Sequence, residues 1–230
     1  GQWARRFRPA GGPQRYWEFG TDHEHITDLD GELETREDAL EFKVETAATD
    51  EIDFAILDVE ERVTTPFTLP GGLIVPAGIY ANDGVSFNIE TARTRPYGLV
   101  AEFQSRDFFG GEADGIEVGL LMRPNRFLDL QIGYEREDIS VPAGDVSVQI
   151  GSVETVVNFS PNLSISTQTQ YDNLSESLSV FGRMRWELRP QTEVFASVAH
   201  GALIEGSDFG RNFRSVQSRS VIRIGNTFRF

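Results

Sequence analysis

The sequence predicts an all-β protein built from antiparallel strands. Segments that alternate apolar and polar residues recur about every 15–20 residues, between clusters of Gly, Pro, Asn and Asp. No stretch sustains apolar residues at the spacing i, i+3, i+4, i+7 that an amphipathic helix requires. The end of the chain shows the alternation most clearly, since Ile222, Ile224 and Phe228 fall on one strand face and Arg223 and Arg229 on the other. One face of such strands suits apolar surroundings and the other suits water.

About twelve strands are expected, and each is bounded by a turn or loop signal. The first three are separated by acidic clusters and a turn through Asp30-Gly31, and those from residue 115 onward alternate more regularly. In chain order the expected strands are residues 16–26, 39–46, 52–62, 84–91, 97–107, 115–122, 127–139, 145–160, 163–171, 177–188, 192–204 and 218–230.

The connections between these strands alternate in length. Tight turns contain Pro124, Pro161 and Pro190, and longer polar loops follow one hairpin away, as at residues 108–114 and 205–217. Short turns on one rim and longer loops on the other are typical of outer-membrane β-barrels, in which the short turns are periplasmic. The closing strand 218–230 then ends on the short-turn rim.

The face-by-face alternation of individual strands has two explanations. In residues 177–189, Leu178, Met184 and Trp186 share one parity, whereas Arg183 and Arg185 share the other, where Phe181 is out of place. The apolar face either packs inward on the core of a soluble β-protein or faces lipid while the polar face lines an aqueous lumen. A lipid-facing Arg at mid-strand costs about 2–4 kcal/mol, so charged positions must face water in either case.

The positions of the aromatic residues favour the membrane barrel. A soluble core more often places large aromatics at strand centres, whereas here they are expected near strand ends, as in the interfacial belts of such barrels. The short-turn belt is predicted to contain Trp186, Phe159, Phe228 and Phe230, and the long-loop belt Tyr134, Tyr171 and Phe103. The charged residues predicted to line the lumen are Arg183, Arg185, Glu187, Arg223, Arg229, Glu154, Glu135, Asp129, Glu117 and Glu102.

Composition excludes several classes of protein. The formal charge is −15, with 36 acidic against 21 basic residues, so nucleic acid is not an expected partner. Only 39% of residues are hydrophobic, the mean hydropathy is −0.30, and no apolar run approaches the ~20 residues of a membrane helix. The chain contains no cysteine, which rules out disulfides and thiolate metal sites. An opening without Met or signal peptide indicates a mature or excised piece of something longer.

Small motifs of possible chemical interest each have a simpler interpretation. His23 and His25 share a strand face at a spacing that could bind zinc or copper, but no third ligand is apparent and a solvated strand end explains them. The sequence Asp28-Leu-Asp-Gly-Glu resembles the start of a calcium loop but lacks the later acidic ligand, and a hairpin turn through Asp30-Gly31 explains it. Hydrolase-elbow, phosphate-loop and zinc-protease signatures are absent. We therefore expect no enzyme, no metal and no cofactor.

Two sets of residues carry family resemblances. The chain end, with Ile222, Ile224, Phe228 and Phe230 two apart, resembles the carboxy-terminal assembly signal of outer-membrane barrels, from which Asn226 departs. From residue 66 onward an ordered set of short motifs follows: Pro66-Phe-Thr-Leu, Ile74-Val-Pro-Ala-Gly-Ile-Tyr80, Phe108-Phe-Gly-Gly, Met122-Arg-Pro-Asn, Tyr134-Glu-Arg, Val157-Asn-Phe-Ser-Pro-Asn-Leu, Gln170-Tyr-Asp-Asn and Arg183-Met-Arg-Trp-Glu-Leu-Arg-Pro. This set resembles the uncharacterised bacterial outer-membrane barrel domain that usually follows a carbohydrate-binding module similar to family 9.

The resemblance implies what the chain is and what accompanies it. Barrels of that family are longer than 230 residues, so residues 1–230 are expected to form the carboxy-terminal portion of an antiparallel transmembrane β-barrel, with upstream strands from elsewhere. The implied location is the bacterial outer membrane, and the implied partners are its lipid bilayer, the barrel assembly machinery, and a glycan-binding module or a second chain that completes the barrel. The family brings no catalytic residues.

The expected function follows from this fold, and several alternatives stay open. The chain is expected to be a porin-like pore, an uptake component or a membrane anchor for a carbohydrate-binding module. The alternative is a soluble all-β carbohydrate-binding or structural protein. Lumen charges either bias permeation or pair across the interior and plug it. Residues 65–78, rich in Pro, Gly and apolar residues, either fold into the barrel or onto its rim, or form a plain extracellular loop.

Overall fold

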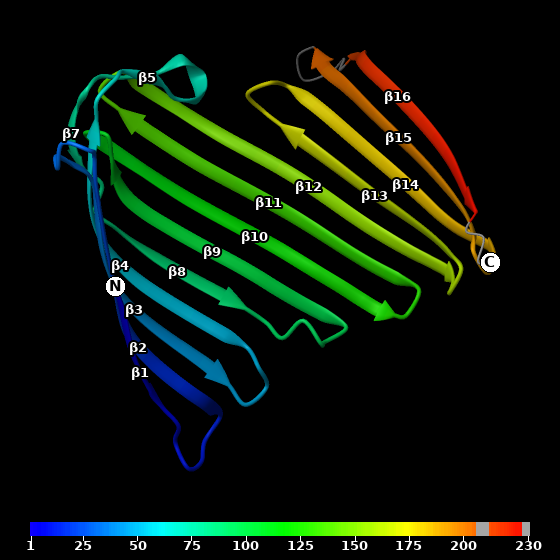
Figure 1. Ribbon diagram of the computed structural model, residues 1–230, viewed down its shortest axis with the longest axis horizontal. Helices are drawn as coiled ribbons and strands as arrows, with labels where there is room; N and C mark the ends of the chain where they lie inside the picture. The colour runs from blue at the N-terminus through cyan, green and yellow to red at the C-terminus, as the bar shows by residue number, and fades with distance from the viewer. Residues whose placement is uncertain (206–211, 227–230) are drawn as a thin grey trace. The chain divides into compact units, whose positions relative to one another are not determined.

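The computed structural model describes residues 1–205 and 212–226, and in these residues the protein is almost entirely β-strand (Figure 1). A 14-stranded sheet follows the order β1-β2-β3-β4-β8-β9-β10-β11-β12-β13-β14-β15-β16, with β7 pairing beside β8 on β4; β5 and β6 form a separate hairpin. No helix in the described part of the chain is long and apolar enough to cross a membrane. The strands are β1 (Gln2–Phe7), β2 (Gln14–Thr27), β3 (Leu33–Thr46), β4 (Glu51–Val63), β5 (Phe67–Thr68), β6 (Ile74–Val75), β7 (Gly78–Ala81), β8 (Gly84–Glu90), β9 (Tyr97–Phe108), β10 (Gly111–Asn125), β11 (Leu128–Val141), β12 (Gly144–Ser160), β13 (Leu163–Asp172), β14 (Ser177–Arg189), β15 (Thr192–Glu205) and β16 (Asn212–Asn226).

The expected fold class is confirmed, because all twelve expected strands are present in one antiparallel sheet. Their bounds differ mostly by one to four residues, although β3 begins at Leu33 rather than at residue 39 and β16 begins at Asn212 rather than at residue 218. The longer loop expected over residues 108–114 is wrong, because β9 ends at Phe108 and β10 begins at Gly111. The end of the strands that carries this turn is called the loop side. The closing strand is β16, and residues 227–230 of the expected segment lie outside the described residues. Strand β1 was not expected, because its six residues show no strong alternation; its pairing with β2 holds it in place. Within the described residues, β1 and β16 each pair with one neighbour.

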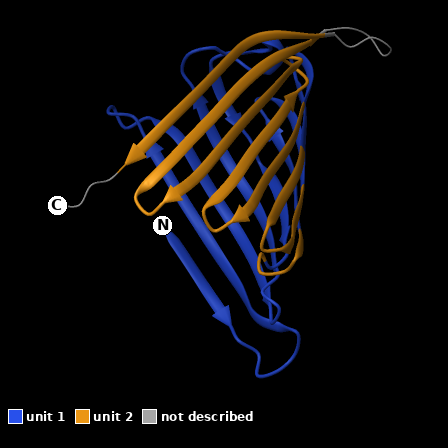
Figure 2. Cartoon of the chain, turned by 90° about the vertical axis from the view of Figure 1, so that its right-hand side faces the viewer, with its two compact units in different colours: residues 1–92, 99–118, 135–148 blue, residues 93–98, 119–134, 149–230 orange. Residues whose placement is uncertain are grey.

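The sheet divides into two compact units (Figure 2). Unit 1 comprises residues 1–92, 99–118 and 135–148, and unit 2 comprises residues 93–98, 119–134 and 149–230. Strands β9, β10, β11 and β12 contribute residues to both units. The expectation of one continuous barrel domain over residues 1–230 stays a prediction.

One face of unit 1 carries a row of phenylalanines that crosses five neighbouring strands. Strand register places Phe19 opposite Phe42, Phe42 opposite Phe54, Phe54 opposite Phe87, and Phe87 opposite Phe103. Each of these side chains is 39–45% exposed. Directly opposed residues of antiparallel strands point to the same side of the sheet, so the five rings form a continuous exposed apolar strip.

Further apolar rows flank the phenylalanine row on the same face. Val44, Ile52 and Ile89 lie on its short-turn side, and Leu40, Ile56 and Val85 on its loop side. The next row towards the loops is charged, since His23 is opposite Asp38 and Asp38 is opposite Asp58. The apolar face of unit 1 is therefore a bounded band rather than a surface that is apolar throughout.

The corresponding face of unit 2 is also apolar and exposed. Leu163, Trp186 and Ile224 belong to one row through β13, β14, β15 and β16, and Met184 and Ile222 belong to the next. Trp186 is 43% exposed, and the exposed fractions of Ile222 and Ile224 exceed 70%. Within residues 1–205 and 212–226, these side chains are not buried in a core.

The buried apolar core lies elsewhere and is small. It consists of Val63, Val75, Phe109, Ala113, Ile139 and Val141, all in unit 1, with Val75 only 2% exposed. Val75 comes from the insert between β4 and β8, residues 64–83, which contains the β5–β6 hairpin and β7. Leu69, Leu73 and Tyr80 of the same insert pack against this core. The insert is thus a folded element and not a plain loop.

Candidate functional site

The polar face of unit 1 is the reverse of its phenylalanine strip. The residues next to the phenylalanines in sequence form their own row, in which Glu18 is opposite Lys43, Lys43 opposite Asp53, Asp53 opposite Asn88, and Asn88 opposite Glu102. Because successive side chains of a strand point to opposite faces, this row and the phenylalanine row cannot share an environment. One sheet therefore presents a hydrocarbon-like strip and a charged strip back to back.

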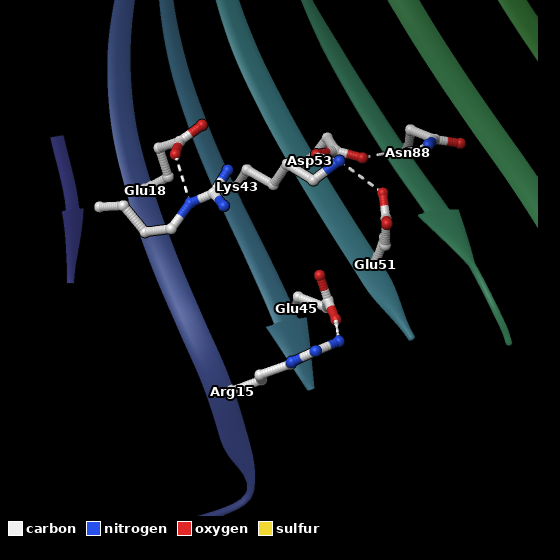
Figure 3. Close-up of polar contacts among 8 residues, drawn as sticks. Arg15, Glu18, Lys43, Glu45, Glu51, Asp53 and Asn88 are labelled. Atoms are coloured by element: carbon white, nitrogen blue, oxygen red, sulfur yellow. Dashed lines mark hydrogen bonds and ion pairs between the residues drawn. The ribbon is translucent and has the colours of Figure 1, made fainter. Parts of the chain in front are cut away.

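Hydrogen bonds and ion pairs connect the side chains of this polar row (Figure 3). Lys43 Nζ contacts the Glu51 carboxylate and lies 3.7 Å from Asp53 Oδ1. Asn88 Nδ2 donates to Asp53 Oδ2 over 3.3 Å. Arg6 donates to Glu18 over 2.7 Å from β1, and Arg15 donates to Glu45 over 2.6 Å near the short-turn end. The carboxylates that face one another across the strands are thereby partly neutralised.

A hollow of about 360 Å³ opens on this polar face between β2 and β8. Its small residues Gly20, Ala55 and Ser86 leave room, and Glu41 stands between them in the same cross-strand row. Glu41 is exposed and makes no hydrogen bond or ion pair with the residues that the structure describes. The polar side chains that line the hollow are Glu18, Glu41, Lys43, Asp53, Ser86 and Asn88. A hollow lined by carboxylates and neutral polar groups suits water or a cationic group.

The polar face continues through β9, β10 and β11 and stays acidic. Glu102, Glu117, Glu135 and Glu137 line a second hollow of about 110 Å³. Arg106 donates to Glu137 over 2.9 Å, which places Glu137 on the face that carries Glu102. The polar face of unit 1 therefore carries more carboxylates than cations.

The polar face of unit 2 carries arginines. Arg183 is opposite Ser166 and Ser197, and Arg185 is opposite Ser164. Arg223 is opposite Phe195, which is itself opposite Arg185. Arg185 Nη2 donates to Glu193 Oε1 over 2.5 Å. Strands β14, β15 and β16 thus bring together, on one face of the sheet, arginines and carboxylates that are separated in sequence.

The insert packs on the side of the sheet that carries the polar face of unit 1, at the loop ends of the strands. Ile139 and Val141 follow Glu137 at two-residue spacing in β11, so all three point to one side of the sheet. Ala113 and Gly115 point to the same side of β10. A Cβ atom placed on Gly115 would lie 3.9 Å from the Cβ atom of Gln104. Val75 of the insert is buried against Ala113, Ile139 and Val141. The insert therefore covers the loop end of the polar face.

The charged residues that were predicted to line the lumen, and that the structure describes, all lie on the polar face of their strands. Asp129 is held at 2.6 Å by Arg123, Glu154 is opposite Gln168, and Glu187 is opposite Glu193. Arg229 lies outside the described residues. Their position against a water-filled lumen stays a prediction. The members on the polar parity are Arg183, Arg185, Glu187, Arg223, Glu154, Glu135, Asp129, Glu117 and Glu102.

The aromatic residues predicted for the two belts are exposed or half-buried where they are described. Tyr134 is exposed, Phe159 is exposed at a bulge between Asn158 and Ser160, and Tyr171 is half-buried. The prediction that Phe103 belongs to a belt near a strand end is wrong, because Phe103 lies in the middle of β9, in the five-residue row of unit 1. Of the predicted assembly signal, Ile222 and Ile224 are described, whereas Phe228 and Phe230 are not.

Charged side chains on the loop side of the apolar band pair with one another. In β11, the apolar stretch ends at Tyr134, and Arg136 then donates two hydrogen bonds of 2.9 and 3.0 Å to Asp138. This charged margin limits the apolar band on the loop side.

The candidate metal and calcium motifs have structural explanations. His23 Nδ1 contacts the carboxylate of Asp38, and His25 is opposite Arg36. The Asp28 side chain accepts the backbone N–H groups of Asp30 and Glu32, each over 2.9 Å, and so closes the β2–β3 turn. In residues 1–205 and 212–226 no group of three or more His, Asp and Glu side chains is placed to hold a metal ion.

Sequence reasoning missed the phenylalanine row and the ion-paired row behind it. Phe42 and Phe54 each lie in an alternating stretch, which is a visible signal. Their alignment across strands depends on register, however, and register follows from turn lengths and pairing that a single strand does not show.

Comparisons with known proteins give one weak likeness. No protein-family model matches the chain, and no curated protein matches it. A solved structure of the NanC porin, in a rhombohedral crystal form, is 12% identical over 86% of this chain and 94% of that chain, with a TM-score of 0.35. A TM-score this low supports no argument about fold or function.

Proposed function

We propose that the protein is an outer-membrane β-barrel protein whose apolar face contacts lipid and whose polar face lines an aqueous passage for small polar solutes. Closure of the sheet, by this chain alone or with upstream strands or a second chain, belongs to the same proposal. The observation that carries it is the back-to-back arrangement in unit 1 of five exposed phenylalanines and an ion-paired polar row.

The exposed apolar face supports a lipid environment. Contiguous apolar patches beyond a few hundred Å² are rare on monomeric soluble proteins and mark membrane or partner contacts. Burial of apolar surface stabilises a protein by about 25 cal/mol per Å², and apolar surface left in water lacks this stabilisation. The exposed strip spans three rows over several strands. Hydrocarbon around this face removes that cost without requiring a second packed layer.

The polar face supports an aqueous environment. Lys43, Asp53 and Glu18 belong to one row and are satisfied by one another and by neighbours. Placed against lipid, such a row would cost several kcal/mol. The insert around Val75 covers the loop end of this face, so we propose that it narrows the passage on that side.

The test begins with purified protein in detergent and continues in planar bilayers. We expect heat-modifiable migration on a gel, because a closed barrel resists detergent until it is boiled, and stepwise conductance after insertion. A monodisperse preparation without detergent would favour the soluble all-β alternative. Heat-modifiable protein that gives no conductance steps, where a known porin conducts, would favour a membrane anchor for a glycan-binding module.

A further inference from the structure

A hollow of about 570 Å³ lies within unit 2, at the short-turn ends of β10, β11, β12 and β13. Two neighbouring turns form its walls. The backbone N–H of Asn158, near the β12–β13 turn, donates to the carbonyl of Phe127 in the β10–β11 turn over 2.8 Å, which holds the two turns side by side (Figure 1). The residues that line the hollow are Arg126, Phe127, Asn158, Phe159, Ser160 and Pro161.

Two exposed rings form the apolar part of this hollow. Phe127 is 44% exposed and Phe159 is 57% exposed. Phe159 is the extra residue of the bulge between Asn158 and Ser160, so no residue of β13 lies opposite it in the strand register. Aromatic rings left in water lack the stabilisation that burial supplies, and a ligand with an apolar part would provide it by covering them.

Arg126 supplies the only charge among the described residues that line the hollow. Its guanidinium carbon Cζ lies 4.7 Å from the centroid of the Phe127 ring, a cation–π contact that positions the group. Arg126 makes no ion pair or hydrogen bond with the residues that the structure describes, so its N–H donors are available to a ligand. Because a guanidinium pairs best with planar or tetrahedral oxyanions, the hollow suits a ligand with one phosphate group.

The apolar face of unit 2 begins beside this hollow. The hydrogen bond between the two turns places Leu128, the first residue of β11, opposite Val157 of β12. Val157 is in turn opposite Ile165 of β13, so the three side chains lie on one side of the sheet. Ile132, four residues beyond Leu128 on the same face of β11, is 39% exposed. A ligand with its phosphate at the turns can therefore extend an apolar chain along these strands.

We propose that this hollow binds the headgroup of one anionic phospholipid, whose acyl chains follow the apolar face of β11, β12 and β13. Arg126 pairs with the phosphate, Phe127 and Phe159 pack against the glycerol backbone and the first methylene groups, and Asn158 offers an amide to the ester oxygens. The ammonium group of a zwitterionic phospholipid would meet no carboxylate among the lining residues. A free phosphate would leave both rings uncovered. The inference depends on the proposed function, because it requires the apolar face to contact lipid.

The experiment counts the phospholipids retained by the purified protein in detergent, by native mass spectrometry, with phosphatidylglycerol and phosphatidylcholine of the same acyl chains. We expect one phosphatidylglycerol per chain, with an affinity at least tenfold above that for phosphatidylcholine. Glycerol 3-phosphate, which lacks acyl chains, is expected not to be retained at the same concentration. Arg126→Gln should weaken phosphatidylglycerol binding about tenfold, and Phe159→Ala about fivefold.

Matched controls are present in the same unit. Arg183 and Phe181 are an exposed arginine and phenylalanine on the polar face of β14, away from the hollow. Arg183→Gln and Phe181→Ala are expected to leave the affinity for phosphatidylglycerol unchanged. Equal affinity for the two phospholipids, retention of glycerol 3-phosphate as strong as that of phosphatidylglycerol, or equal effects of Arg126→Gln and Arg183→Gln would overturn the inference.

The same preparation separates failure of the inference from failure of the proposed function. Heat-modifiable, conducting protein that shows no preference for phosphatidylglycerol rejects only the phospholipid site. Protein that prefers phosphatidylglycerol through Arg126 but gives no conductance steps supports the site and rejects only the passage. Protein that is monodisperse without detergent and retains no phospholipid overturns both.

Discussion

Replacing Phe54 with arginine is expected to lower the free energy of unfolding in lipid vesicles by about 2–4 kcal/mol, the cost of a cation on the lipid face of a barrel. Phe54 is the central member of the five-residue phenylalanine row and is 40% exposed. The measurement is reversible denaturant unfolding from phospholipid vesicles, followed by fluorescence of the three tryptophans.

The control for Phe54→Arg is Ala55→Arg, one residue along the same strand. Ala55 lines the hollow on the polar face, beside the unpaired carboxylate of Glu41. We expect a change of less than about 1 kcal/mol there, since the new cation meets water and a carboxylate. A larger loss for Ala55→Arg than for Phe54→Arg would show that the apolar face does not contact hydrocarbon.

Replacing Val75 with aspartate is expected to release the insert from the polar face. Val75 is 2% exposed and lies among Ala113, Ile139 and Val141, where a carboxylate has no partner. Burying an unpaired charge costs several kcal/mol, so the insert opens locally while the sheet stays folded. A cost of about 3 kcal/mol raises the open population, and with it the rate of chymotrypsin cleavage at Phe67 and Tyr80, by about 100-fold.

The matched control is Ile74→Asp in the same short strand. Ile74 is 60% exposed, so a carboxylate there stays in water and cleavage should proceed at the rate of the unmodified protein. If both variants are cleaved equally fast, the insert is not anchored through Val75. If neither is cleaved faster, the cluster around Val75 does not hold the insert down.

Most of the strand pattern could be predicted from the sequence, because alternation and turn residues act over short distances. The turns that contain Pro161 and Pro190 separate strands at the expected positions, and the pattern in β13 and β14 matches the two faces that register confirms. Strand β1 could not be predicted, since its pairing partner in β2 and not its own pattern specifies it. The start of β3 could not be predicted for the same reason, since its first residues are mostly charged and the pairing of the strand, not their pattern, specifies it.

The candidate site was only partly accessible to sequence reasoning. Arg183, Arg185 and Glu154 could be assigned to a polar parity because parity is local. The pairing of Lys43 with Asp53, the hollow around Glu41, and the positions of Phe181 and Phe195 depend on which residues oppose one another across strands. The core around Val75 joins residues of the insert to residues of β4, the β9–β10 turn, β10 and β11. No short-range sequence pattern encodes these contacts.

Accessibility of single cysteines along β4 shows which face of the sheet meets lipid, and the measurement is clean because the chain contains no cysteine of its own. Ile52, Phe54 and Ile56 occupy the apolar face, and Asp53, Ala55 and Leu57 the polar face. In reconstituted vesicles we predict that cysteines at 52, 54 and 56 react with a lipid-soluble maleimide and resist a charged one, whereas those at 53, 55 and 57 react with the charged reagent. Labelling of positions 52, 54 and 56 by the charged reagent, with protection of positions 53, 55 and 57, would show that the apolar face meets water and not lipid.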